Sequence, residues 1–342
     1  MAKPLLEALT LVFEDELAEL PFRPYTMLSM SRKRLATQTQ IKWQANVGGG
    51  VANGRATTAD AGSADNTDIV KPAELPIGGR VINHVFNLPL TEIVQARGTA
   101  IPVLRDLFAS HMQTAMDVIL PQLNLNLFTG TGANDATHNG VVGLSSVINN
   151  SATYGTINPS VDTLWQANVM GNGGTARLLT PDLLRMVQIE IARKGAPYDV
   201  ILTTPEIVEV YGKLFAQDRG LTVTQVNGTA DLGFSGYNWK GRPILVDTQC
   251  PNGHMYFLNS RDVQVYTYDF SGANNEIAVT KRLQNTNGLQ FMIAQLNNRN
   301  PHNIEFEISV CPQLKVHNRK SVSVITDINQ SLGAYDPEVP ET

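Results

Sequence analysis

Apolar positions recur at helical spacing in two parts of the first 130 residues. Residues 1–20 place apolar side chains on one side with acidic residues between them, which predicts an amphipathic helix ending before Pro21. Such a helix is compatible with an arm that binds a neighbouring subunit and equally with a helix packed on its own core. A longer helix is predicted over 99–128, with Thr99 as its N-cap and with Pro121 expected to kink or shorten it.

Two shorter helices each begin at a Thr-Pro pair. Thr180 and Pro181 precede the apolar pattern of 183–194, and a second Thr-Pro pair precedes the pattern of 207–215. A short buried strand is predicted between them at 198–202. The segments together form a helix–strand–helix unit.

The rest of the chain alternates in a way that favours strands. The Asn-Gly pair at 252–253 predicts a tight hairpin between the first two of them. The final residues, from 331 to 342, are expected to be a mobile tail. The predicted strands cover 243–247, 254–258, 263–268, 289–296, 304–310 and 321–326.

One segment cannot form a compact core of its own. Two strand-like runs, 41–47 and 80–88, flank about thirty residues rich in Gly, Ala, Thr, Asn and Asp. A loop of that length is usually functional or disordered. Ordered ends with a polar tip predict a ribbon that projects from its own subunit and lies on another. The expected subunit-contact residues are Lys42, Trp43, Asn46, Arg55, Lys71, Val85 and Phe86, together with Leu9 and Phe13 of the first helix.

Composition supports a chain that is covered by copies of itself. At 342 residues the chain is long enough for two or more sub-domains. Charged residues make up 17%, below the roughly 25% of an average soluble domain. The net charge of −5 argues against a dedicated nucleic-acid binder, and the basic cluster Arg32-Lys33-Arg34 is interpreted as a solvated arm segment in preference to a phosphate site.

The cysteine content and the hydropathy of the chain indicate the compartment in which the protein is made. Two cysteines exclude a disulfide framework and fit a reducing environment. The N-terminus lacks the pattern of a signal peptide, and no run of eighteen apolar residues indicates a membrane span. Synthesis in the cytoplasm is therefore expected.

No pattern of residues predicts catalysis. Cys250 and His254 supply two donors where zinc requires three or four. Glu305 and Glu307 fall on one face of a predicted strand, where a solvated edge face is favoured over an acid/base pair. We therefore expect no catalytic, cofactor-binding or metal-binding residues, and no enzyme.

The order of these parts resembles the major capsid protein of tailed bacteriophages, with its Hong Kong 97-type (HK97-like) fold. The helix over 101–128 followed by Thr-Gly-Thr-Gly at 129–132 and Gly-Val-Val-Gly-Leu at 140–144 is similar to that family's spine helix and the turn after it. The run YDVILTTP at 198–205 is similar to the strand-into-helix step of its axial domain, and WKGRPI at 239–244 to the start of the next strand.

The resemblance implies an α+β capsid fold with an N-terminal arm, an extended loop (E-loop), a peripheral domain with a long spine helix, and an axial domain. It further implies pentamers and hexamers that form an icosahedral shell around double-stranded DNA, a separate scaffolding protein, a portal, a possible cement protein, and location in the virion. The implied boundaries are 1–38 for the arm, 39–90 for the E-loop, 91–150 with 276–330 for the peripheral domain, 151–275 for the axial domain and 331–342 for the tail.

Two alternatives remain open at this point. An encapsulin-type nanocompartment uses the same fold to enclose enzymes, and the helix at 1–20 could serve its inner surface. A soluble enzyme with a flexible lid would use the ribbon as a gate, although no polar cluster in the sequence is placed beneath it.

Overall fold

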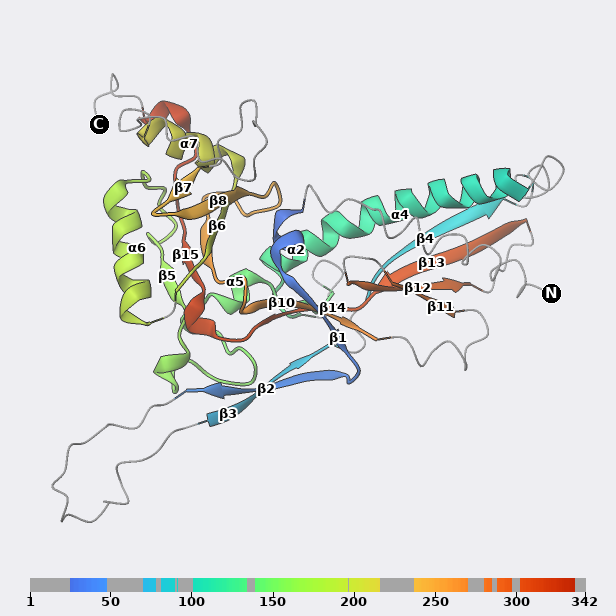
Figure 1. Ribbon diagram of the computed structural model, residues 1–342, viewed down its shortest axis with the longest axis horizontal. Coiled ribbons are helices and arrows are strands. Elements are labelled where there is room, and N and C mark those ends of the chain that lie inside the picture. Colours follow the sequence, from blue (N-terminus) through green and yellow to red (C-terminus); the bar gives the residue numbers. More distant parts are fainter. Residues whose placement is uncertain are drawn as a thin grey trace, which may run out of the picture. The chain divides into compact units, whose positions relative to one another are not determined.

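The computed structural model describes residues 25–47, 70–77, 81–89, 91, 101–133, 139–195, 197–215, 237–269, 280–284, 288–296 and 302–335. The chain divides into two compact units, each assembled from three separated stretches (Figure 1). The first unit contains residues 1–41, 76–144 and 264–315, and the second contains 42–75, 145–263 and 316–342. An element at a boundary is described with the unit that holds most of it.

The first unit combines a long helix with two sheets. One sheet has the strand order β1-β10-β14 and the other has the order β11-β12-β13-β4. Strand β4 runs antiparallel to β13 with Phe86 opposite Phe306, and the ring of Phe86 also stacks on His111 of α4, at 6.0 Å between centroids. The elements are α2 (Thr26–Met30), β1 (Arg32–Ala36), β4 (Ile82–Pro89), α4 (Ile101–Thr129), β10 (Val263–Tyr268), β11 (Thr280–Gln284), β12 (Gln290–Gln295), β13 (Asn303–Val310) and β14 (Pro312–Val316).

Helix α4 ends in a turn that only glycine can form. Gly130 donates its N–H to the Asn126 carbonyl at 2.9 Å, and Gly143 donates to the Gly130 carbonyl at 2.8 Å. A Cβ on Gly130 would lie 2.4 Å from the Val141 carbonyl oxygen, and one on Gly143 would lie 2.5 Å from the Gly130 nitrogen. The two glycine motifs of the sequence are therefore one packed turn, in which backbone touches backbone.

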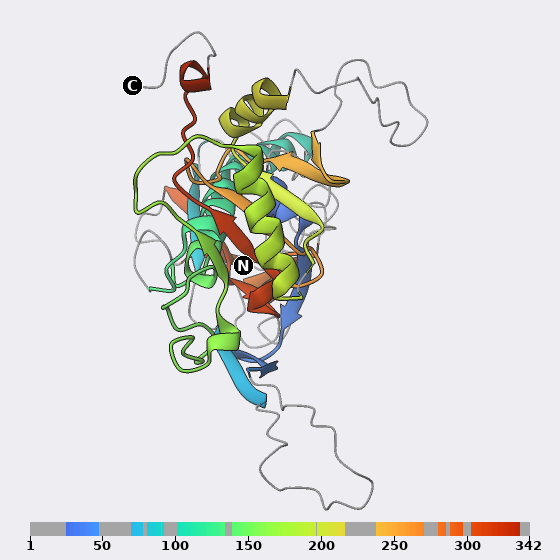
Figure 2. The same cartoon turned by 90° about the vertical axis from the view of Figure 1, so that its left-hand side faces the viewer.

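The second unit is built on a six-stranded sheet with the order β5-β15-β9-β6-β8-β7. Helix α6 packs on β5 and β15, and Figure 2 shows it in yellow-green in front of the sheet. Thr180 caps this helix by accepting the Leu183 N–H at 3.2 Å, as its sequence predicts. The elements are α5 (Leu144–Val147), η1 (Thr163–Trp165), β5 (Asn168–Met170), α6 (Pro181–Arg193), β6 (Val200–Thr203), α7 (Pro205–Phe215), β7 (Asn238–Trp239), β8 (Arg242–Val246), β9 (Met255–Leu258), η3 (Arg319–Ser321), β15 (Ser323–Ile325) and η4 (Leu332–Tyr335).

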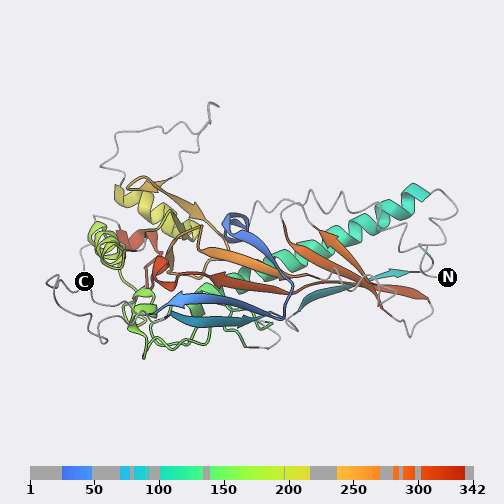
Figure 3. The same ribbon diagram turned by 60° about the horizontal axis from the view of Figure 1, so that its bottom comes forward.

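The predicted ribbon has a different partner strand from the one expected. Strand β2 (Gln40–Asn46) pairs with β3 (Val70–Pro76), which the sequence pattern missed, and the two lie side by side in Figure 3. The run at 80–88 forms β4 in the other unit instead. A strand containing two prolines, Pro72 and Pro76, has little strand propensity, and only its pairing with β2 makes it one.

Two local predictions are wrong, and one of the two effects expected of Pro121 is excluded. Strands β8 and β9 are not a hairpin, because β6 lies between them, parallel to β8 and antiparallel to β9. Helix α4 continues through Pro121 to Thr129 and is not shortened. Strand β13 lies between β12 and β4, so Glu305 and Glu307 are on an interior strand and not on a solvated edge.

Two groupings along the chain also change. Residues 323–325 pair with β5 and β9, so 316–330 belong to the second unit and not with the late strands of the first. The segment Leu332–Tyr335, expected to be part of the tail, forms a 3-10 helix. Residues 336–342, the predicted helix at 1–20 and the Thr99 cap lie outside the described residues.

Candidate subunit-contact site

The base of the ribbon has one face buried by its own unit and one face exposed. Along β2 the side chains of Trp43 and Ala45 are buried, while Lys42, Gln44 and Asn46 are exposed. This alternation is the period of a strand that packs on one side only. Strand β2 is thus held in place by its buried face, and its other face is exposed.

Aromatic contacts hold the buried face. The Trp43 ring lies 5.9 Å from Tyr154, and Tyr154 lies 6.2 Å from Trp165 between centroids. Gly155 allows this approach, since a Cβ there would lie 3.0 Å from the Ala73 Cβ and 3.1 Å from the Trp43 ring. The Glu74 N–H donates to the Gly155 carbonyl at 3.1 Å. Both ribbon strands are therefore anchored to one turn.

A buried cation supports the same turn. The Arg319 side chain is fully buried, donates to the carbonyls of Val147 at 2.6 Å and Asn149 at 2.5 Å, and lies 5.8 Å from the Tyr154 ring centroid. The Tyr154 hydroxyl accepts the Val316 N–H at 2.7 Å. Burial lowers the pKa of Arg319 to about 10, so the guanidinium stays charged at neutral pH.

Both lysines at the base of the ribbon form ion pairs. Lys42 of β2 pairs with Glu74 of β3 at 3.0 Å. Lys71 of β3 pairs with both oxygens of Asp162 at 2.8 Å, which joins the ribbon to the loop before η1. The first pair is solvent-exposed and contributes little stability, whereas the second is partly shielded.

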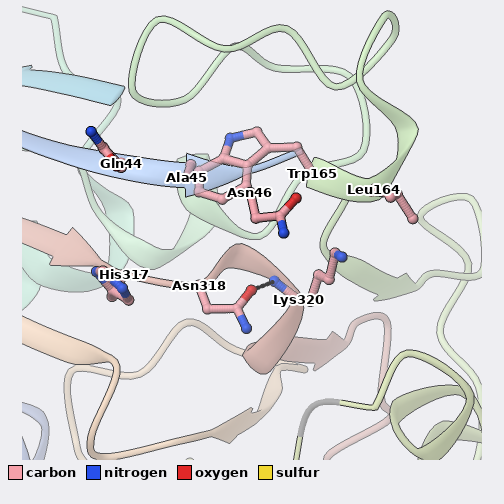
Figure 4. Close-up of a pocket in the computed structure, with 8 residues that line it drawn as sticks. All are labelled: Gln44, Ala45, Asn46, Leu164, Trp165, His317, Asn318 and Lys320. Carbon is pink, nitrogen blue, oxygen red and sulfur yellow. Dashed lines mark hydrogen bonds between the residues drawn. The ribbon is translucent and has the colours of Figure 1, made fainter. Parts of the chain in front are cut away.

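A shallow pocket of about 360 Å³ lies beside β2 (Figure 4). Its lining combines Trp165 and Leu164 with the cation Lys320, and it contains no carboxylate. Leu164 is 46% exposed and Val161, in the same loop, is 73% exposed. The lining of the pocket is thus partly apolar and partly polar. Its lining residues are Gln44, Ala45, Asn46, Leu164, Trp165, His317, Asn318 and Lys320.

The structure does not bring all the expected contact residues together. Lys42, Trp43, Asn46 and Lys71 share the ribbon base. Val85 and Phe86 lie on β4 of the other unit, and Leu9, Phe13 and Arg55 lie outside the described residues.

Two of the expected contacts are already buried by their own unit. Trp43 is 8% exposed and Phe86 is 7% exposed, so the expectation that a neighbour buries them is wrong. Val85 is 43% exposed and remains available. The sequence analysis did not predict that Tyr154, Asp162 and Arg319 support the ribbon. These residues lie far from the ribbon in the sequence, and no sequence pattern connects them to it.

Two further features of the described residues concern metal binding and thiol chemistry. No three His, Cys, Asp or Glu side chains are placed there to hold a metal ion. Cys250 is buried with its thiol directed at backbone carbonyls, and burial raises the pKa of that thiol. None of the described helices is long and apolar enough to cross a membrane.

Comparison with known proteins identifies the fold. No protein-family model matches the chain, and no curated protein sequence matches it either. Among solved structures, a chain of the cyanophage A-1(L) capsid asymmetric unit is 28% identical, with a TM-score of 0.76 over 89% of this chain and 93% of that one. This chain therefore has the Hong Kong 97-type fold that capsid structures share.

Other solved shells share the fold at lower identity. The encapsulin of the holo-SrpI complex from Synechococcus elongatus PCC 7942 is 13% identical, with a TM-score of 0.55 over 90% of this chain and 89% of that one. The capsid of a native GTA particle is 10% identical, with a TM-score of 0.57 over 89% and 91%. At these identities the likeness concerns the fold alone, and the encapsulin is a weaker match than the cyanophage capsid.

Proposed function

We propose that this chain is the major capsid subunit of a tailed phage, assembling into pentamers and hexamers of an icosahedral head that encloses double-stranded DNA. The observation that carries the proposal is the likeness to the cyanophage capsid chain, which extends over about nine tenths of both chains. The sequence identity is 28%, compared with 13% and 10% for the two other shells that share the fold. The proposed role is structural and not enzymatic.

The ribbon supplies the physical reason for assembly. A two-stranded ribbon is marginal in water by itself, yet here its base is fixed by Trp43, Tyr154 and the Lys71–Asp162 pair. The sequence between the strands, 48–69, is too rich in Gly, Ala, Thr, Asn and Asp to bury a core. An adjacent subunit gives such a segment partners, and many small contacts repeated by symmetry add up to a stable shell.

We assign the domains accordingly. Residues 1–38 are the arm and 39–77 the ribbon of the E-loop, while α4 with the β11-β12-β13-β4 sheet forms the peripheral domain and the six-stranded sheet the axial domain. The exposed Lys42, Asn46 and Val85, with Arg55, Leu9 and Phe13, are proposed subunit contacts. A scaffolding protein, a portal and a cement protein are the proposed partners, and synthesis in the host cytoplasm precedes incorporation into the virion.

Assembly of the purified chain tests this function. The chain is expressed alone and together with its scaffolding protein, and both samples are examined by negative-stain electron microscopy. Closed shells of uniform diameter in at least one sample are expected. Only small, uniform particles in both samples would contradict the proposal.

Removing the ribbon tip tests its role separately. Deletion of 48–68 is expected to leave a folded subunit, by circular dichroism and thermal melting, that assembles poorly. A Gly-Ser segment of equal length in the same place is the matched control, because it keeps the connection and removes the side chains. If either variant unfolds the subunit, the ribbon is part of its own core and the proposed role in assembly is wrong.

A further inference from the structure

The three-stranded sheet of the first unit carries positive charge without any acidic residue. Strands β1, β10 and β14 contain Arg32, Lys33, Arg34 and Lys315, and no Asp or Glu. The whole chain has a net charge of −5. A local excess of positive charge against an acidic background indicates an anionic partner. The basic cluster that the sequence assigned to a solvated arm segment lies on strand β1, where Arg32 and Arg34 are exposed.

Strand register places three of these cations on one face. Arg34 of β1 is paired with Tyr266 of β10, and the Lys315 ammonium of β14 lies 5.4 Å from the Tyr266 ring centroid. Arg32 is two residues before Arg34 and therefore shares its face. Arg32, Arg34, Tyr266 and Lys315 form this cationic face.

Lys33 belongs to the opposite face. It is paired with the fully buried Val265, and its ammonium donates to the Ser29 carbonyl at 2.9 Å. Its side chain also lies against Gly288. Lys33 is thus used within the fold. The exposed Arg32 and Arg34, together with the largely buried Lys315, define the cationic face.

The charges on the cationic face are crowded. Burial and, after it, the positive charge of Arg34 lower the pKa of the Lys315 ammonium. Arg32 and Arg34 are exposed, and no described carboxylate forms an ion pair with either of them. Like charges held together in this way are stabilised when an anion binds among them.

The face is also open along one side. In the order β1-β10-β14, β1 is an edge strand, so among the described strands none covers its outer backbone groups. Its two arginines lie about 7 Å apart along the strand. Guanidinium groups bind phosphate in a bidentate manner, and free backbone N–H groups are further phosphate donors. An extended polyphosphate fits these features.

We propose that the cationic face binds the phosphate backbone of duplex DNA, with Arg32 and Arg34 as the phosphate-contacting residues. The inference rests on the proposed function in one respect, since the DNA available to a capsid subunit is the packaged genome. We expect binding to be independent of base sequence, because phosphate contacts carry no sequence information. Contacts of this kind hold the outer layer of DNA against the wall without fixing its register.

An acidic protein segment is the competing occupant. Residues 1–20 carry five acidic side chains, and such a segment could neutralise the same face. The regular spacing of two exposed arginines on an uncovered edge favours a polymer of evenly spaced phosphates over a helix with clustered carboxylates. The experiment includes this alternative as an outcome.

Salt-dependent binding tests the proposal. The unassembled full chain and its R32Q/R34Q variant are titrated with a fluorescent 30-base-pair duplex at increasing NaCl, and binding is followed by anisotropy. Each phosphate contact contributes about 0.9 to the slope of log K against log salt. Loss of both arginines should therefore flatten that slope by about 1.8. The K240Q/R242Q variant removes the same charge from the exposed β7–β8 turn of the other unit and should leave the slope unchanged.

Three outcomes overturn the proposal. The first is that the wild-type chain does not bind the duplex. The second is that the two double variants flatten the slope equally, which would indicate a dependence on net charge alone. A synthetic peptide of residues 1–20 that binds wild type but not R32Q/R34Q, while the duplex binds both equally, assigns the face to the acidic segment instead. Shell formation by R32Q/R34Q is checked in parallel, so that loss of DNA binding is distinguished from failure of the capsid function itself.

Discussion

Lys71 and Asp162 lie 91 positions apart in the sequence, and the Lys71 ammonium contacts both oxygens of the Asp162 carboxylate at 2.8 Å. This pair ties the second strand of the ribbon to a loop that also carries the exposed Val161 and Leu164. The ribbon is thereby held at its base by charge on one side and by aromatic contacts on the other.

The ion pair between Lys71 and Asp162 should contribute modestly to stability. We expect K71M and D162N each to lower the unfolding free energy by about 1 kcal/mol, with a coupling energy of about the same size in the double variant, because the pair is partly exposed. Urea denaturation of the four proteins measures this. K42M is the control at a more exposed pair and should cost less. Additive losses for K71M and D162N would show that the pair is not coupled.

Gly155 should be required for packing and not only for its backbone conformation. Gly155 and Gly173 both have positive φ, +62° and +65°, but only Gly155 is crowded. We expect G173A to cost about 1 kcal/mol from the strained backbone, and G155A to cost about 2 kcal/mol more because its Cβ meets Ala73 and Trp43. Thermal melting of both variants gives the difference. Equal losses would mean that the turn yields without strain.

The turn after α4 should not accept any side chain. We expect G130A and G143A each to cost about 3 kcal/mol or to prevent folding, because the added Cβ meets backbone atoms that cannot move aside. Soluble yield and melting temperature measure the effect. G333A is the control, since the nearest atom to its added Cβ is the Ser331 hydroxyl at 3.9 Å, and it should be neutral. A stable G130A would show that the helix end can shift.

Asp327 should make the second unit sensitive to acid. The hydrogen bond from the Asn172 N–H is the main reason that the pKa of the Asp327 carboxyl lies below its ordinary value, and the Gly174 N–H acts in the same direction. A carboxyl with a lowered pKa stabilises the fold above its unfolded value of about 3.9, and that stability is lost as the pH falls through the folded value.

The matching variant is D327N, because asparagine also tolerates the positive φ of +63° at this position. Wild type should lose stability below about pH 4 that D327N does not lose, when both are compared by urea denaturation from pH 3 to pH 7. Parallel pH profiles of the two proteins would show that the carboxylate is not responsible. The Thr326 hydroxyl, which also donates to Asp327, is unchanged in both.

The amino-acid pattern alone predicted the elements whose signals are local. The caps at Thr180 and Thr204 and the long helix α4 follow from side chains within a few residues of one another, and the structure confirms them. The glycine motifs after α4 were also visible. Their packing was not, because it depends on the approach of Val141 and Gly143 from beyond the turn.

Only the tertiary structure decided which strands meet. Strand β3 is a strand because β2 lies beside it, and β6 separates β8 from β9 although an Asn-Gly turn favours a hairpin there. Sheet pairing is non-local, so residues far apart in sequence set it and no short pattern records it. The same holds for Arg34, Tyr266 and Lys315, which become one cationic face only when three distant strands are aligned.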